Sequence, residues 1–334
     1  MTCADSAKRS QNVGMLRLPS LVVLFVVSCR VSSGPPAVAS KSVESLPAPS
    51  TPPRSYRARF TSSPPVVDGR LDDAAWNDAA WTDDFLDIEG ATRPTPRYRT
   101  RAKLLWDERL LYVAAELEEP DVWATLRSHD EIVFHDDDFE IFVDPDGDRR
   151  AYYELETNAL GTVFDLFLPR TYRDGGPAVH SWNCQGLVTR IDVQGSLNDP
   201  RDEDRGWTLE WAIPWNSLVP PDHGDGGAPL PAVDEERRRH GAAPKEGDTW
   251  RINFSRVEWK QNFEHLDAHG RRIGPSRPAA NAAISAGNTG SAAPLVPYEK
   301  APGEKEDNWV WSPQGVVDMH LPERWGEVVF VRAR

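Results

Sequence analysis

Residues 132–168 read IVFHDDDFEIFVDPDGDRRAYYELETNALGTVFDLFL, and this stretch decides the fold. Between 139 and 143, apolar residues alternate with other side chains, which is the period-two pattern of a β-strand. An acidic turn, DPDGD at 144–148, follows, and 152–157 returns as a strand rich in aromatic and β-branched residues. A second turn leads into a third strand at 163–167. The stretch therefore predicts a β-meander that carries acidic groups at its turns.

The same strand signal recurs along the rest of the chain in short segments. Strands are predicted at 57–60, 85–88, 99–106, 110–117, 187–193, 207–213, 250–259 and 325–331. We expect Asp72 to cap a brief helix that contains Trp76, because an N-cap aspartate accepts hydrogen bonds from free backbone amides. Short strands with almost no helical periodicity predict an all-β fold, an antiparallel β-sandwich of the jelly-roll or immunoglobulin-like type. Two Gly- and Pro-rich segments, about 220–248 and 267–307, are predicted as long loop insertions.

The first 29 residues have the pattern of an export signal. Basic residues up to Arg17 precede an apolar run at 21–27 that is too short to span a bilayer. The run ends at Ser28–Cys29, and a small residue directly before a cysteine resembles the lipobox of bacterial lipoproteins. That resemblance implies cleavage before Cys29 and a lipid on its sulfur. An ordinary secretory signal is the alternative, and Met15 is an alternative start.

Residues 30–55 are rich in Pro, Ser and Ala, and we interpret them as a disordered tether between the anchor and a folded domain at 56–334. The protein is then exported and lipid-anchored at the cell envelope, on the periplasmic or outer-membrane face, or else secreted. Cys184 is the one cysteine of the chain that follows Cys29, so no disulfide is expected in the folded domain.

Composition excludes one class of partner and draws attention to one residue type. The formal net charge of −14 argues against nucleic acid, because such a chain offers no excess of basic groups to neutralise phosphates. Thirteen tryptophans are many for this length. Tryptophan serves either as a large core residue or as a flat platform for a ligand.

Several motifs occur in an order that resembles carbohydrate-binding module family 9. They are VDGRLD at 67–72 followed by Trp76, LWD at 105–107 with LYV at 111–113, DFEIFVD at 138–144, YYE at 152–154 and WAIPW at 211–215. The resemblance covers roughly residues 56–332. It implies a β-sandwich that binds sugars, is often appended to xylanases, contains structural calcium and does not itself catalyse a reaction.

The resemblance also assigns roles to particular residues. Two aromatic rings clamp the sugar in the family, and they correspond to Phe134 and to Trp311, with Trp309 beside it. Glu140 corresponds to the acidic residue that accepts hydrogen bonds from sugar hydroxyls. The chain departs from the family in having Phe at 134, where Trp is usual, and in lacking the ligand-contacting Arg on the returning strand, which reads YELE at 153–156. In these respects it resembles stand-alone, exported relatives.

The chemistry of sugar recognition leads to a candidate set. A pyranose lays its apolar face on a flat ring, and its hydroxyls pair with carboxylate, amide or guanidinium groups. The candidate carbohydrate-binding residues are Phe134, Glu140, Asn158, Arg256, Trp309 and Trp311. For each tryptophan the alternative is a role in the core.

The acidic turn is a candidate calcium site. Asp144, Asp146 and Asp148 place carboxylates two residues apart, as oxygen-rich calcium loops do. The turn is not an EF-hand, because the twelfth position counted from Asp144 is Leu155. A solvated hairpin turn, which uses Asp and Gly for its backbone, is the alternative.

The sequence thus predicts non-catalytic binding of a xylan- or glucan-type poly- or oligosaccharide, in support of polysaccharide catabolism by glycoside hydrolases. The first alternative is a glycoside hydrolase, which needs two suitably spaced carboxylates, a condition that an acidic chain meets too easily to be informative. The second is a haem-binding electron-transfer subunit, for which Met319 beside His320 would be the ligand candidates.

Overall fold

The computed structural model describes residues 52–199, 202–231, 233–261 and 300–332. The chain divides into two units, residues 1–46 and 47–334. The predicted export segment, Cys29 and most of the predicted tether lie outside the described residues, as does the 267–299 part of the second loop insertion. Within the described ranges, no helix is long and apolar enough to cross a membrane.

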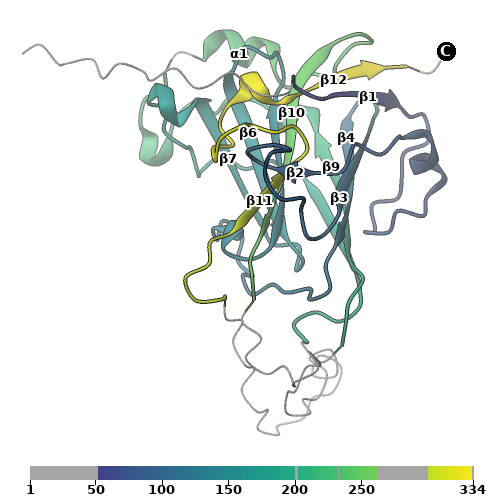
Figure 1. The fold of residues 1–334 in the computed structure, drawn as a ribbon. Coiled ribbons are helices and arrows are strands. Elements are labelled where there is room, and N and C mark those ends of the chain that lie inside the picture. The colour runs from purple at the N-terminus through teal and green to yellow at the C-terminus, as the bar shows by residue number, and fades with distance from the viewer. Residues whose placement is uncertain (1–51, 200–201, 232, 262–299, 333–334) are drawn as a thin grey trace, which may run out of the picture. The chain divides into compact units, whose positions relative to one another are not determined.

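The described part of the second unit contains twelve strands in one curled sheet (Figure 1). They are β1 Ser55–Phe60, β2 Leu86–Asp87, β3 Thr100–Trp106, β4 Leu110–Glu118, β5 Asp138–Asp144, β6 Arg150–Asn158, β7 Val163–Arg170, β8 Val188–Gln194, β9 Gly206–Pro214, β10 Thr249–Glu258, β11 Asp307–Val310 and β12 Gly326–Val331. The order is β7-β6-β5-β10-β12-β1-β3-β4-β9-β8, and β11 pairs with both β10 and β2. The predicted meander is confirmed as β5–β6–β7, antiparallel throughout.

The sheet folds over so that its two halves pack as a sandwich. Phe139 of β5 meets Trp211 of β9 with ring centroids 5.6 Å apart, although the two strands belong to opposite ends of the strand order. Side chains at every second position of β9, from Trp207 to Ile213, lie in this core, as predicted. The all-β sandwich is therefore confirmed.

The sandwich is not antiparallel throughout. Strand β1 pairs in parallel with β12 on one side and with β3 on the other, and so joins the two halves of the sheet. The sequence pattern of a strand does not report its direction relative to its neighbours, so these two pairings were not foreseen.

Helical structure in the described residues is limited to short pieces. They are α1 Asp234–Arg239 and the 3₁₀ turns Ala74–Asp78, Val133–His135, Tyr172–Asp174, Trp215–Ser217, Asp225–Gly227 and Pro322–Arg324. The predicted cap at Asp72 is wrong. Asp73 holds the N-cap position of Ala74–Asp78, and its carboxylate instead accepts a hydrogen bond from the amide of Val66 at 2.8 Å. The turn is fixed by Trp76, whose Nε1 donates to Glu210 at 2.7 Å.

The first loop insertion does separate two strands, β9 and β10, and it contains α1. The end of the second differs from the prediction, because residues 307–310 form strand β11. Trp309 therefore lies in a paired strand, opposite Arg256 of β10 and Asp87 of β2, and not in a loop.

Candidate functional site

A cleft of about 450 Å³ lies on the face of β5, β6 and β7 that points away from the core. The alternation of β5 creates this face: Phe139, Ile141 and Val143 enter the core, whereas Glu140 and Phe142 line the cleft. Strand β6 contributes Glu154 and Glu156 on the same face, and β7 contributes apolar side chains. Residues 317–320, which precede β12, form part of the opposite wall.

Carboxylates crowd the floor of the cleft. Glu140 lies directly across from Glu156 in the strand register, and Glu154 lies across from Phe142. Glu140, Glu154 and Glu156 are 5%, 6% and 2% exposed, so each has lost most of its contact with water. Beneath them, Asp138 is fully buried, and carboxylate oxygens of Asp138, Glu140 and Glu156 lie within 4.8 Å of one another.

Burial and mutual repulsion make these acids hard to ionise. Burial raises the pKa of Glu140 to about 7. Burial, with the charge of Glu140 adding to it, raises the pKa of Glu154 to about 8. The pKa values of Asp138 and Glu156 are raised well above their usual range for the same two reasons. At neutral pH the floor therefore holds protonated carboxyls or requires a cation.

Two exposed aromatic rings stand at the cleft. Phe134, on the turn Val133–His135, is 37% exposed, and its backbone amide donates to Glu156 at 3.2 Å. Tyr172, on the turn Tyr172–Asp174 after β7, is 48% exposed. Both residues line the cleft, so aromatic surface and carboxylates are offered to the same ligand. Of the six predicted binding residues, the structure brings Phe134 and Glu140 together here.

Trp311 and Trp309 do not present a ring to the cleft. Trp311 is 1% exposed and packs against Tyr56 and Phe254, with centroid distances of 6.4 and 5.9 Å. Gly326 lies so close that a Cβ there would fall 2.2 Å from the ring of Trp311. Trp309 is 3% exposed, and the guanidinium of Arg256 sits 5.2 Å from its ring. The expected loop position is thus corrected, since both rings are covered by other side chains.

Asn158, which was predicted to contact the sugar, is instead hydrogen-bonded within the protein. Its side-chain nitrogen donates to the carbonyl of Leu126 and to Asp136, both at 2.9 Å. Its oxygen accepts from the amides of Leu160 and Thr162 at 3.0 and 3.1 Å. The amide group is fully buried and holds the β6–β7 turn, so its hydrogen bonds are already used within the protein.

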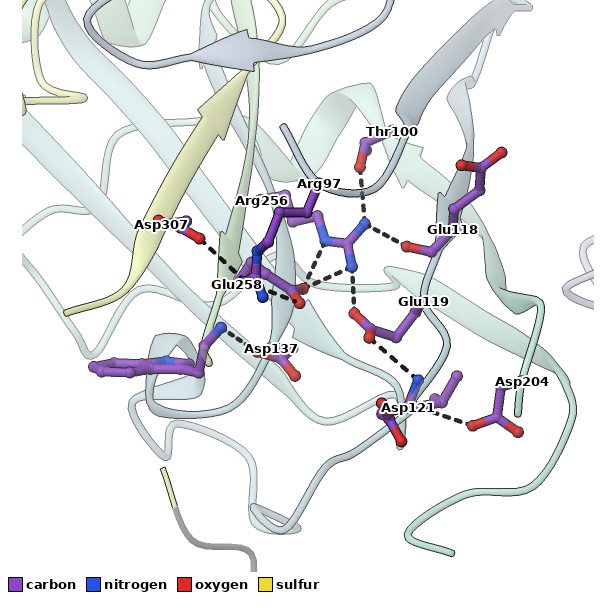
Figure 2. A network of polar contacts seen from close by, with 12 residues as sticks. Arg97, Thr100, Glu118, Glu119, Asp121, Asp137, Asp204, Arg256, Glu258 and Asp307 are labelled. Carbon is purple, nitrogen blue, oxygen red and sulfur yellow. Dashed lines mark hydrogen bonds and ion pairs between the residues drawn. The ribbon is translucent and has the colours of Figure 1, made fainter. Parts of the chain in front are cut away.

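Arg256 is the centre of a buried polar network on the other side of β10 (Figure 2). Its Nε and Nη2 donate to Glu258, at 3.2 and 2.7 Å, and Nη2 also donates to Glu119. Its Nη1 donates to Thr100 at 3.0 Å and to the carbonyl of Glu118 at 2.9 Å. These contacts account for all five N–H groups of the guanidinium. Arg256 therefore ties β10 to β3 and to the end of β4, and it does not face the cleft.

The acidic turn between β5 and β6 has the spacing of a cation site. Carboxylate oxygens of Asp144, Asp146 and Asp148 lie within 4.8 Å of one another, a separation that one calcium ion bridges. Asp144 is fully buried, and burial together with the two neighbouring charges raises its pKa to about 7. It already accepts hydrogen bonds from the amides of Gly147 and Arg149, at 3.0 and 2.9 Å.

A positively charged side chain of the protein already contacts one of the three candidate calcium ligands. Arg239 of α1 donates to Asp146 at 2.9 Å, and His240 lies 3.9 Å from the same carboxylate. Burial alone would raise the pKa of Asp146, but the nearby imidazole of His240 and the hydrogen bond from Arg239 lower it to about 2. The three aspartates fit calcium in spacing and chemistry, and the guanidinium already supplies part of the compensating charge.

Sequence reasoning missed three cleft residues. Glu154 and Glu156 were noted as a departure from the family, yet their alternation along one strand already placed them on one face. Tyr172 stands in the turn TYRDGG at 171–176, where an aromatic residue among turn-forming residues was the available signal of exposure.

Comparison with known proteins identifies the domain that carries this cleft. Residues 67–228 match the family described as carbohydrate family 9 binding domain-like. An exoglucanase, XynX, of Acetivibrio thermocellus is 30% identical over 158 residues, covering 46% of this chain and 12% of that enzyme. Endo-1,4-beta-xylanase A of Thermoanaerobacterium saccharolyticum is 28% identical over 156 residues, covering 47% of this chain and 11% of that enzyme. The chain thus spans about an eighth or less of the length of these curated relatives.

A solved structure supports the fold. A candidate carbohydrate-binding protein from Bacteroides uniformis superimposes with a TM-score of 0.51 at 16% identity, covering 83% of this chain and 99% of that one. The motifs, the sandwich and the family match agree. Residues 67–228 therefore form a carbohydrate family 9 binding domain-like domain.

Proposed function

We propose that the protein binds carbohydrate without catalysing a reaction, and that the cleft on β5–β7 holds the ligand. The observation that supports this most directly is the pairing of exposed rings with carboxylates in one cleft: Phe134 and Tyr172 stand beside Glu140, Glu154 and Glu156. A sugar ring can lay its C–H face on an aromatic ring while its hydroxyls donate to the carboxylates. The volume of about 450 Å³ suits one or a few sugar residues.

The ligand is proposed to be a poly- or oligosaccharide of the xylan or glucan type. The relatives that match this domain are an exoglucanase and a xylanase by name, and the match covers a small part of each. A binding role in polysaccharide catabolism, alongside separate glycoside hydrolases, follows as part of the same proposal.

The decisive experiment is calorimetric titration of the full chain with xylo- and cello-oligosaccharides. Phe134→Ala and Tyr172→Ala are expected to weaken binding at least tenfold, because each removes one stacking surface. Val66→Ala is the matched control, since Val66 is 66% exposed and lies outside the cleft. Saturable binding that both cleft variants retain in full would place the ligand elsewhere. Release of reducing ends from xylan would favour a glycoside hydrolase, and a haem absorption band would favour the electron-transfer alternative.

We further propose that the chain is exported and lipid-anchored through Cys29. The apolar run ending in Ser28–Cys29 supports the proposal. Metabolic labelling with a radioactive fatty acid in a bacterial host tests it: Cys29→Ala should lose the label, whereas Cys184→Ala should keep it, because Cys184 is buried in the sandwich. Equal labelling of both variants would contradict lipidation at Cys29.

The acidic turn at Asp144, Asp146 and Asp148 is proposed to hold a structural calcium ion. Its support is the 4.8 Å grouping of the three carboxylates and the raised pKa of Asp144, which a cation would relieve. When bound, the ion would neutralise this turn and stiffen the β5–β6 hairpin.

A further inference from the structure

The charge of the cleft raises a question about its ligand. Five of the residues that line it are acidic: Glu140, Glu154, Glu156, Glu306 and Asp318. The described lining contains no lysine or arginine, and its two histidines are His180 and His320. Burial lowers the pKa of His320 to about 4, so this ring is neutral at physiological pH. The cleft therefore lacks a strong internal counter-charge.

Two buried glutamates elsewhere in the protein do have a cation beside them. Glu119 and Glu258 are as deeply buried as the cleft glutamates, and the guanidinium of Arg256 lies between them (Figure 2). For Glu154 and Glu156, by contrast, the charged groups that raise the pKa are other carboxylates. A cation that the fold supplies in one acidic cluster is missing from the other.

One oxygen atom on the cleft floor and one beneath it also have no hydrogen-bond partner among the described residues. Glu154 lines the cleft, and its Oε2 makes no hydrogen bond. Asp138 is fully buried in the cluster with Glu140 and Glu156, and its Oδ2 makes none either. A buried acceptor without a donor is costly, so these atoms favour a ligand that brings N–H donors and positive charge to the floor.

We propose that the cleft recognises an amino sugar, a glucan-type chain whose residues carry protonated amines. This inference rests on the proposed carbohydrate-binding function and narrows its ligand. An ammonium group can donate three hydrogen bonds to the carboxylates of the floor while the sugar ring stacks at the rim. The rings of Phe134 and Tyr172 line the same cleft and attract a cation as well as a C–H face. A calcium or magnesium ion takes oxygen ligands and would not use these rings as a stacking surface.

The test uses two oligosaccharides that differ by one chemical group. The full chain is titrated at about pH 5.5, where even an amine flanked by electron-withdrawing oxygens is largely protonated, with a β-1,4-linked glucosamine oligomer and with its N-acetylated counterpart of equal length. Acetylation removes the charge and keeps the backbone. We expect the amine form to bind at least tenfold more tightly, and we expect added salt to reduce this advantage. Cello-oligosaccharide of equal length serves as the neutral glucan.

Glutamate-to-glutamine variants of the cleft floor test whether the carboxyl groups, and not the shape of the cleft, give the preference for the amine. Glu154→Gln and Glu156→Gln should each reduce the ratio of amine to acetyl affinity, because each removes a carboxyl group that a bound ammonium ion would hold in its charged form, and each nearly preserves side-chain volume. Glu246→Gln, at an exposed position outside the cleft, should leave the ratio unchanged. Thermal melts confirm that each variant is folded.

The outcomes separate failure of this inference from failure of the proposed carbohydrate-binding function. Binding of cello- or N-acetylated oligomers that equals or exceeds binding of the amine form overturns the inference and leaves carbohydrate binding intact. Neutral binding that appears only with added calcium also overturns it, since the missing cation would then be a metal. Failure of every oligosaccharide to bind overturns both proposals.

Discussion

Replacing Glu154 with glutamine is expected to change how the stability of the protein depends on pH. Burial, reinforced by Glu140, raises the pKa of Glu154 from 4.5 in the unfolded chain to about 8 in the folded protein. Between these values the folded state keeps a proton that the unfolded chain has released. The resulting stabilisation is complete below the unfolded pKa and is lost as the pH rises through the folded pKa, so the free energy of unfolding falls with increasing pH.

The size of the effect follows from the width of that window. Within this pH range, each pH unit lowers the free energy of unfolding by about 1.4 kcal/mol for one titrating proton. Raising the pH from about 5 to about 7 should therefore lower the free energy of unfolding by about 2–3 kcal/mol through Glu154 alone. The pKa of Glu140 is raised to about 7, and this residue adds to the fall in the wild-type protein. In Glu154→Gln the side chain cannot ionise, so its share of the slope disappears.

Urea unfolding at about pH 5, 6 and 7, followed by tryptophan fluorescence, measures the effect. The quantity of interest is the difference in unfolding free energy between Glu154→Gln and the wild type, because titrations common to both proteins cancel in it. This difference should shift in favour of the variant by about 2–3 kcal/mol over the range. Glu246→Gln, an exposed substitution, should give a constant difference. Parallel curves for Glu154→Gln and wild type would refute the burial argument for the cleft floor.

Three further predictions concern groups outside the cleft floor. Trp311→Ala should lower the free energy of unfolding by about 3–5 kcal/mol in urea titrations, because it empties a fully packed core site; a loss under 1 kcal/mol would mean that the ring is more exposed than the structure indicates. Arg256→Met should cost about 3–5 kcal/mol near neutral pH, because Glu119 loses its buried counter-charge, and the loss should shrink as the pH is lowered and Glu119 becomes protonated; a loss independent of pH would contradict this. Arg239→Gln should tighten calcium binding at the acidic turn, measured by calorimetry against Arg238→Gln as control, because it frees Asp146 from an internal cation; unchanged or absent calcium binding in Arg239→Gln would exclude the proposed site.

The strands could be predicted because their signal is local. Phe139, Ile141 and Val143 alternate with cleft-facing residues, and this period of two is visible in five consecutive letters. It also places Glu140 on the outer face, and the turn at Val133–His135 brings Phe134 to the same cleft. This part of the site needed no knowledge of distant segments.

The predicted residues that lie outside the cleft are placed there by contacts between remote segments. Nothing next to Trp311 in the sequence indicates that Tyr56 and Gly326 cover its ring. Arg256 has the chemistry of a sugar ligand, but its donors are consumed by residues near positions 100 and 119. A residue type suggests what a side chain can bind, and the fold decides whether that capacity remains available.

The position of β1 has a consequence for how the molecule is made. This strand is among the first parts of the domain to leave the ribosome, yet its partner β12 is among the last: Tyr56 aligns with Val328. Until synthesis reaches that point, the two halves of the sheet lack the strand pairing that joins them, and the edges of β1 and β10 that flank β12 stay open. Such distant pairing slows folding. The nascent domain would stay accessible to chaperones until β12 has emerged, and deletion of β12 would leave β1 with β3 as its remaining partner.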